Sequence, residues 1–301
     1  MESKFDKIKR LILIQFKYLW YSIRISGRNY NKGVTCIVFS RDRAMQLDFL
    51  LASMKKFSKA HIPVVVQYSC SENHTSSYNV LINKYPDVNF VKETSVRETL
   101  IRLLLELRTE YMFYLVDDQV FIREFDIKEL LGKLKKGVFA SMRLGETITN
   151  WGIKDVAIRG NYRKEGNFLH WRWNDNKANH DWGYQFSVDG TIYRTVDILR
   201  CSLSIPFKAP NSYEANMNSV ILFKSNNSGI SFKRPVVVNL IINASRQEKG
   251  YETCEAGEYT ADDLLKLYES GKTFDFDKVA SIPYCSSHHI INDINTILKD
   301  A

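Results

Sequence analysis

The sequence predicts an α/β fold in which helices cover both faces of a largely parallel sheet. Three observations lead to this prediction. The chain has 301 residues, 45% of them hydrophobic and 25% charged, which is ample for a folded core. Its first half contains short runs that are apolar throughout, and each run is followed by a helical pattern. Strands that are apolar on both sides are covered on both faces, as in parallel sheets.

The elements follow one another in regular order. We predict strands at 34–39, 62–68, 88–91 and 111–116, and helices at 44–57, near 76–84 and at 96–107. The last of these helices begins with a capping box made by Ser95 and Glu98. The second half changes to strands at 137–144 and 184–194, separated by a polar, tryptophan-rich stretch at 151–183. We therefore expect a mixed arrangement there.

The N-terminal segment is predicted to form a basic amphipathic helix over residues 1–28, with a short linker to residue 32. At about 100° per residue, six apolar side chains share one stripe: Phe5, Ile8, Ile12, Phe16, Leu19 and Ile23. Residues 1–32 hold eight basic and two acidic side chains, a net +6 within a chain total of +8. Apolar area combined with positive charge favours binding to an anionic membrane. The alternative is a helix that packs on its own domain with a solvated basic face.

Residues 33–301 are expected to form one domain. This body holds 34 basic and 32 acidic groups, a net charge of only +2, which argues against a nucleic-acid partner. The five cysteines are widely spaced without a CxxC pair, so we expect neither a disulfide framework nor a zinc site. No signal peptide or membrane-spanning stretch is apparent. We predict a cytoplasmic protein at the inner face of a membrane.

Two acidic residues, Asp117 and Asp118, follow directly after the apolar run at 111–116. Ligands of open α/β sheets bind at the carboxyl ends of strands, so both carboxylates are expected in a crevice. Adjacent carboxylates repel each other, and a hard divalent cation that bridges them to diphosphate oxygens would relieve the repulsion. The alternative is that one aspartate caps the next turn while the other is solvated.

A second polar cluster ends the first predicted strand, where Ser40, Arg41, Asp42 and Arg43 stand together. Ser40 or Asp42 can cap the following helix, and the arginines can reach a phosphate. Capping alone would not explain two arginines. We expect Ser40, Arg41 and Arg43 to bind the same ligand as the aspartate pair.

These motifs resemble the nucleotide-sugar half of a GT-A fold glycosyltransferase. FSRDRAMQLDFLLASM and, about seventy residues on, FYLVDDQVF carry the likeness, with Asp117-Asp118 in place of the DxD motif. It continues through FSVDGTIYR, PNSYEANM, VVVNLIINASRQEKGY and LLKLYESGKTF, and spans roughly residues 34–290. The resemblance implies transfer of a sugar from a nucleoside diphosphate sugar to a glycan or glycolipid acceptor. Residues 33–123 would bind the donor and residues 124–301 the acceptor.

The resemblance also implies a Mn or Mg ion on the diphosphate, held by the last acid of the motif, here Asp118. Asp117 would then contact the ribose or the metal. A histidine near the C-terminus often completes such a site, and His288 and His289 are the candidates, of which only one can ligate if they lie on a strand. Gln119 departs from the acid-rich form of the motif. This favours the alternative of an inactive scaffold that binds nucleotide or glycan; a nucleotidyltransferase is a further alternative.

An inverting transfer needs a carboxylate base that activates the acceptor hydroxyl. In transferases of this fold the base lies downstream of the metal motif, often at the start of a helix, and Glu214 in PNSYEAN matches that placement. The alternative is that Asn211 and Glu214 form a capping box. Asp189 and Asp181 are the next candidates.

The stretch 151–183 is predicted to bind the acceptor. Trp171, Trp173 and Trp182 stand there among polar side chains, and the apolar faces of sugars stack on exposed indoles. A long loop packed around its own aromatic residues would have the same composition.

Overall fold

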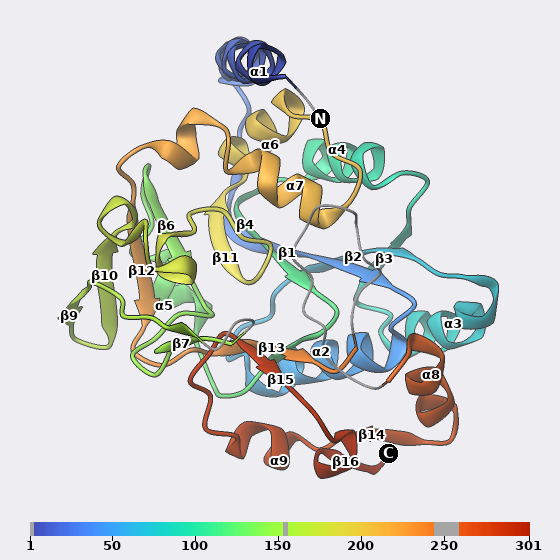
Figure 1. Ribbon diagram of the computed structural model, residues 1–301. Coiled ribbons are helices and arrows are strands. Elements are labelled where there is room, and N and C mark those ends of the chain that lie inside the picture. The colour runs from blue at the N-terminus through green and yellow to red at the C-terminus, as the bar shows by residue number, and fades with distance from the viewer. Residues whose placement is uncertain (1–2, 153–155, 244–258) are drawn as a thin grey trace.

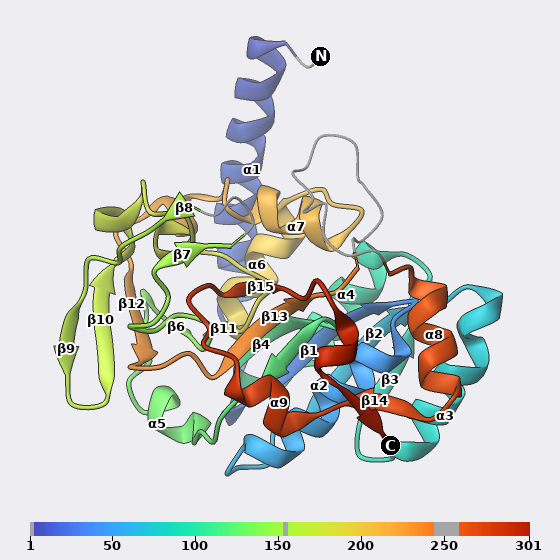
Figure 2. The ribbon, with the colours of Figure 1, turned by 60° about the horizontal axis from the view of Figure 1, so that its bottom comes forward.

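The computed structural model describes residues 3–152, 156–243 and 259–301. Within them a mixed sheet of nine strands runs in the order β3-β2-β1-β4-β11-β6-β12-β10-β9 (Figure 1). Helices flank this sheet, and a three-stranded sheet, β15-β13-β5, lies beside it (Figure 2). The predicted α/β class, with a mixed central sheet flanked by helices, is confirmed.

The first half folds as predicted. Its strands are β1 (Asn31–Arg41), β2 (Val64–Ser69), β3 (Asn89–Lys92) and β4 (Thr109–Val116), and its helices are α2 (Ala44–Phe57), α3 (Thr75–Lys84) and α4 (Val96–Glu106). The four strands are parallel, with β1 between β2 and β4. Ser95 caps α4 by accepting a hydrogen bond from the amide of Glu98 at 3.1 Å. The carboxyl ends of β1 and β4 therefore lie next to each other.

The second half is mixed, as expected. The large sheet is completed by β6 (Val138–Ser141), β9 (Arg163–Glu165), β10 (Phe168–Arg172), β11 (Thr191–Arg194) and β12 (Ser228–Phe232), and the smaller sheet consists of β5 (Gln119–Phe121), β13 (Val237–Ile241) and β15 (His288–Ile290). Two further pairs are β7 (Asn150–Trp151) with β8 (Val156–Ala157) and β14 (Lys272–Phe274) with β16 (Leu298–Asp300). The other α-helices of this half are α5 (Ile127–Leu131), α6 (Thr195–Ser204), α7 (Pro210–Met217), α8 (Ala261–Glu269) and α9 (Phe276–Ser281). Single 3-10 turns are η1 (Glu72–His74), η2 (Trp173–Asn176), η3 (His180–Gly183), η4 (Ile221–Lys224) and η5 (Ile294–Thr296).

The strand predicted at 184–194 is wrong over most of its length. Only its last four residues pair, as β11, with β4 and β6, and the residues before them form a loop. The loop ends at Gly190, whose φ of +73° favours glycine and whose amide donates to the carbonyl of Tyr114 at 2.8 Å. This loop carries Asp189 to a position beside β4, which is where the candidate site lies.

Apolar layers cover both faces of the large sheet. On one face, Ile37 of β1 and Tyr114 of β4 belong to a core that includes α4, α6 and α7. On the other face, Cys36 and Phe113 of the same strands pack with α2, α3 and α5. A third cluster joins α2 and the smaller sheet to α8 and α9. The smaller sheet is thereby held against the carboxyl ends of β1 and β4.

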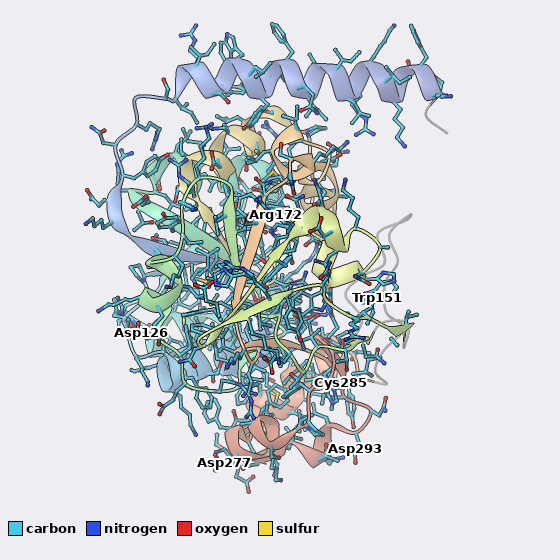
Figure 3. The ribbon with its side chains drawn as sticks, turned by 90° about the vertical axis from the view of Figure 1, so that its left-hand side faces the viewer. Asp126, Trp151, Arg172, Asp277, Cys285 and Asp293 are labelled. Carbon is cyan, nitrogen blue, oxygen red and sulfur yellow. The ribbon has the colours of Figure 1, made fainter. Side chains whose placement is uncertain are left out.

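The N-terminal helix, α1 (Lys4–Arg24), lies across one end of the body, with side chains projecting from its outer side (Figure 3). It packs against α6, and buried Ile14 and partly buried Tyr18 join the core. The six side chains of the predicted stripe are between 47% and 75% exposed, and Leu13 and Trp20 beside them are 52% and 44% exposed. Strand β1 begins at Asn31, within the predicted linker. Among the described residues, none forms a helix with the length and apolar character needed to cross a membrane.

Candidate functional site

The carboxyl ends of β1 and β4 bring the two predicted polar clusters together. Arg41 donates its backbone amide to Asp117 Oδ2 at 2.9 Å. Arg43 Nη1 lies 3.1 Å from Asp117 Oδ1 and 3.2 Å from Asp118 Oδ2. The same guanidinium donates through Nη2 to the carbonyl of Asn243 at 3.0 Å. The aspartate pair therefore has a counter-charge within the protein, a role that we expected a metal ion to fill.

The turn between β1 and α2 directs Arg43 toward the aspartates. Asp42 has a left-handed φ of +53°, and its carboxylate accepts a hydrogen bond from the amide of Ser71 at 2.6 Å. Ser40 Oγ lies 2.6 Å from the hydroxyl of Tyr78. Neither side chain caps α2, whose N-cap residue is Arg43. The predicted capping by Ser40 or Asp42 is wrong, because both polar groups are used to hold the turn.

Opposing influences act on the charge of Asp118. Burial is the largest of them and, with the neighbouring Asp117, raises the pKa of Asp118 to about 6 despite the opposing charge of Arg43. Asp118 Oδ1 also accepts a hydrogen bond from Asn239 Nδ2 at 3.3 Å. The carboxylate of Asp118 thus receives one donor from the start of α2 and another from β13.

A second acidic centre, Asp189, lies on the far side of Asn239. Asn239 Nδ2 is 3.4 Å from Asp189 Oδ1, and His288 Nε2 is 3.7 Å from Asp189 Oδ2. Burial alone would raise the pKa of Asp189, but the interaction with His288 lowers it below its ordinary value. Asp189 is therefore ionised at neutral pH. The structure brings together the predicted donor-binding residue Asp118 and the predicted catalytic residue Asp189.

Asp181, another predicted base, is the partner of a buried arginine. Its Oδ1 lies 2.7 Å from Arg143 Nη1, and its Oδ2 accepts a hydrogen bond from Ser287 Oγ at 2.6 Å. The two charged side chains are only 2% and 8% exposed. With both oxygens occupied, Asp181 is not suited to accept a proton from a substrate. The pair instead ties the turn η3 to the loop after β6 and to the residue before β15.

Glu214 lies on α7 but does not cap it. The N-cap residue is Ala209, and the hydroxyl of Ser212 accepts the hydrogen bond of its amide at 3.0 Å, so the alternative of a capping box made by Asn211 and Glu214 is wrong. Glu214 Oε1 instead accepts a hydrogen bond from the backbone amide next to Asp189, at 3.0 Å. Burial, reinforced by the charge of Asp189, raises the pKa of Glu214 to about 8. At neutral pH Glu214 is therefore largely protonated while Asp189 is ionised, so of the two carboxyl groups Asp189 is the one in the form that accepts a proton.

The sequence of the chain can be compared with those of known proteins. No protein-family model matches the chain. In an alignment 222 positions long, which covers 64% of this chain, it is 32% identical to the bifunctional glycosyltransferase pgtA of Dictyostelium discoideum. The chain is similar to a glycosyltransferase. This confirms the predicted resemblance, although the chain spans only 29% of the length of that relative.

Solved structures that match part of the chain include Staphylococcus aureus TarS and the bifunctional glycosyltransferase WbbM. Staphylococcus aureus TarS 1–349 in complex with UDP-GlcNAc matches with a TM-score of 0.45 and 14% identity, over 77% of this chain and 64% of that chain. The complex of the same TarS fragment with UDP gives 0.43 and 13%, over 66% and 58%. The bifunctional glycosyltransferase WbbM gives 0.36 and 12%, over 64% and 38%. Because these TM-scores lie below 0.5, the likeness to glycosyltransferases rests on the sequence relative.

The predicted metal ligands do not form a metal centre by themselves. Across the described ranges, no group of three or more His, Cys, Asp and Glu side chains could hold a metal ion. His288 Nδ1 lies 3.0 Å from Ser287 Oγ, while its other ring nitrogen faces Asp189. His289 packs edge-on against the ring of Tyr284, with the ring centres 5.2 Å apart. These contacts do not test the role of Asp118, His288 and His289 as metal ligands, which stays a prediction.

The three tryptophans predicted to bind the acceptor lie in the core. Trp173 and Trp182 are 0% exposed and Trp171 is 5% exposed, and Trp171 packs edge-on against both of the others. Glycines make room for the rings, since a Cβ at Gly229 would lie 2.0 Å from Trp171 and one at Gly160 would lie 2.5 Å from Trp182. Buried indoles offer no face to a sugar, so the predicted acceptor site is wrong and the packed-loop alternative holds.

Arg143 and Asn239 escaped prediction from the sequence. Asn239 interrupts the apolar run VVVNLII, and this is the signal that could have found it, because a buried amide needs hydrogen-bond partners. Arg143, in ASMRLG, lies one residue before the end of the strand predicted at 137–144 and carries no comparable signal. The segment VVVNLIINASRQEKGY, which carries part of the resemblance, is described only as far as Asn243; its remaining residues lie outside the described ranges.

Proposed function

We propose that the chain is a GT-A glycosyltransferase that moves a sugar from a nucleoside diphosphate sugar to a glycan or glycolipid acceptor, with inversion at the anomeric carbon. One observation carries the proposal: Asn239 connects Asp118, at the carboxyl end of β4, to a second carboxylate, Asp189. Such a site has two ends, which we call its poles: one, at Asp118, for a diphosphate and the other, at Asp189, for an acceptor hydroxyl. The 32% identity to a glycosyltransferase supports the same reading.

Each pole has a distinct task in the proposed reaction. Arg43 and Arg41 supply positive charge for the diphosphate, whose negative charge grows as its bond to the sugar breaks. Asp117 and Asp118 contact the donor, and Asp189 accepts the proton of the acceptor hydroxyl as the hydroxyl oxygen attacks the anomeric carbon. A positioned base of this kind contributes about 10²- to 10⁴-fold to the rate. Ser40 holds the turn that presents the two arginines.

A divalent cation, Mn or Mg, belongs to the proposal only at Asp118. When bound, it would neutralise the diphosphate, and the diphosphate and water would have to supply its other ligands. Because Arg43 already lies 3.2 Å from Asp118, the cation and the guanidinium would share that carboxylate. Turnover of the donor in EDTA against turnover in Mn measures how far the reaction depends on the cation.

The proposal is tested with a panel of nucleoside diphosphate sugars that includes UDP-GlcNAc, the molecule bound in one of the TarS structures. We expect at least one donor to bind and to release its nucleoside diphosphate, and Asp118→Ala to abolish both events. Asp277→Ala, whose side chain is 97% exposed, is the matched control and should behave as wild type. Unchanged donor binding by Asp118→Ala would contradict the assignment. Release of pyrophosphate would indicate a nucleotidyltransferase, and binding without turnover would indicate a scaffold.

We also propose that α1 docks the protein on the cytoplasmic face of an anionic membrane. Its six-residue stripe, together with Leu13 and Trp20, leaves eight large apolar side chains 44–75% exposed. Lys9, Lys17 and Arg24 lie beside them on the helix surface. Insertion of the apolar face and attraction of the basic groups to anionic lipids add to each other.

Sedimentation with vesicles tests the membrane proposal. The full chain should bind vesicles of phosphatidylglycerol and phosphatidylcholine, more weakly at high salt, and should bind pure phosphatidylcholine poorly. Phe16→Glu should lower binding to the anionic vesicles about tenfold or more, since it removes one large apolar side chain from the inserted face. Val80→Glu, which changes a 52% exposed apolar residue on α3, is the matched control and should bind as wild type. Equal binding by the two variants would overturn the proposal.

A further inference from the structure

Three polar side chains occupy one row of the smaller sheet. Asn239 of β13 stands opposite Gln119 of β5 and opposite His288 of β15 in the strand register. Residues in one row across neighbouring strands project from the same face. Gln119 directly follows the aspartate pair, and His288 faces Asp189. The row therefore runs between the two poles of the candidate site.

The hydrogen bonds of this row fix the orientation of both amides. The backbone amide of Val116 can only donate, and it donates to Gln119 Oε1 at 2.9 Å. Gln119 must therefore present Nε2 to its other partner, Asn239 Oδ1, at 3.1 Å. Asn239 in turn must present Nδ2 to the carboxylates, which lie 3.3 Å away at Asp118 Oδ1 and 3.4 Å away at Asp189 Oδ1. The backbone amide of Val116 thus fixes Asn239 Nδ2 as the hydrogen-bond donor to both aspartates.

A glutamate or aspartate at position 119 would break this series of hydrogen bonds. A carboxylate can accept the bond from Val116 but has no hydrogen for Asn239 Oδ1, so Asn239 would turn its own NH₂ group to it. Asn239 Oδ1 would then face Asp118 and Asp189, and oxygen would meet oxygen at both contacts. A third carboxylate would also be added beside Asp117 and Asp118 in a region where all these side chains are largely buried.

We propose that Gln119 and Asn239 are positioning residues: Gln119 orients the amide of Asn239, and Asn239 holds the donor-side carboxylate of Asp118 and the acceptor-side carboxylate of Asp189 in one fixed geometry. The inference rests on the proposed glycosyl transfer. It also explains why Gln119 stands where the acid-rich motif has an aspartate. The amide at position 119 orients Asn239 so that its NH₂ group can donate hydrogen bonds to both aspartates. Gln119 is then a feature of an active site rather than of an inactive scaffold.

Two variants that preserve size test the inference. Gln119→Glu loses the Nε2 donor and reverses Asn239, whereas Gln119→Met loses the donor without adding an oxygen. We expect kcat for release of nucleoside diphosphate to fall about 100-fold in Gln119→Glu, as for other small misplacements of reacting groups, and less in Gln119→Met. The KM for the donor should change less than threefold in both. Asn176→Asp, at a fully buried amide that donates to the carbonyl of Asn161 at 3.1 Å, is the matched control for burial of a charge and should keep its kcat.

A crystal structure of Gln119→Glu provides a readout that does not depend on activity. We expect Asn239 to lose its contacts with Asp118 and Asp189, with both carboxylates moved apart. Retention of both contacts, or a kcat within twofold of wild type, would overturn the inference. Failure of the proposed function is distinct, because it would appear as absence of turnover in the wild-type protein with every donor of the panel.

Discussion

The N-terminal helix and the tryptophan-rich segment both mix aromatic with polar side chains, and the fold uses them in opposite ways. On α1, Phe16 is 67% exposed and Ile23 is 75% exposed, while the helix packs on the body through Ile14. In the segment 151–183, Trp173 and Trp182 are completely buried. The polar segment 151–183 thus contributes side chains to the hydrophobic core, whereas the apolar stripe of α1 remains exposed to solvent.

The contrast shows that periodicity identifies which side chains share a face but not which face finds a partner. The partners of α1 are α6 and a loop near Ser219, whose carbonyl accepts a hydrogen bond from Gln15 at 3.1 Å. The partners of the tryptophans include Gly229, almost sixty residues further along the chain, where the missing Cβ admits an indole. Neither partner is visible within the segment itself.

The largest effect is expected from removing a buried indole. Trp182→Ala should lower the free energy of unfolding by about 3–5 kcal/mol, because it leaves a cavity among Trp171, Tyr162 and the backbone of Gly160. Trp20→Ala on α1 is the matched control, and its 44% exposed ring should cost no more than about 0.5 kcal/mol. Urea unfolding of both variants measures the difference. Similar losses of unfolding free energy in the two variants would contradict the contrast between a buried and an exposed aromatic region.

A smaller effect separates the two faces of α1. Ile14→Ala should cost roughly 2 kcal/mol, at the low end for a buried isoleucine because the helix covers the core from one side only. Ile12→Ala, two positions away and 64% exposed, should change the stability by less than about 0.5 kcal/mol. Thermal unfolding in the absence of lipid compares them. If Ile12→Ala lowered the stability as much as Ile14→Ala, the apolar stripe would have to pack against the protein body rather than face solvent.

A third effect concerns the buried acid of α7 and depends on pH. Since burial raises the pKa of Glu214 from 4.5 to about 8, the folded state favours its protonated form. Its contribution to stability is complete below pH 4.5 and is lost as the pH rises through about 8. Glu214→Gln cannot ionise and keeps the oxygen that accepts the bond from Val188. The variant should match wild type near pH 5 and become relatively more stable toward pH 9; a difference independent of pH would contradict the assignment.

Much of the fold was predictable because its signals are local. Apolar runs and helical spacing predicted α2 to its end residues, and the same reasoning found Asp117, Asp118 and Arg43 at the ends of neighbouring strands. What escaped prediction depends on contacts between distant segments. The pairing of Asp181 with Arg143, and the amide of Asn239 between two aspartates, join residues 38 or more positions apart. No local pattern encodes such partners.

The central claim is that Asp189 is the base of a glycosyl transfer whose donor is bound at Asp118. Asp189→Asn tests it most directly, because the change keeps the size of the side chain and a hydrogen-bond acceptor while it removes the negative charge. We measure donor affinity by calorimetry and release of nucleoside diphosphate in the same preparations. The account predicts unchanged donor affinity and a loss of turnover of about 10²- to 10⁴-fold. Near-normal turnover with unchanged affinity would contradict it.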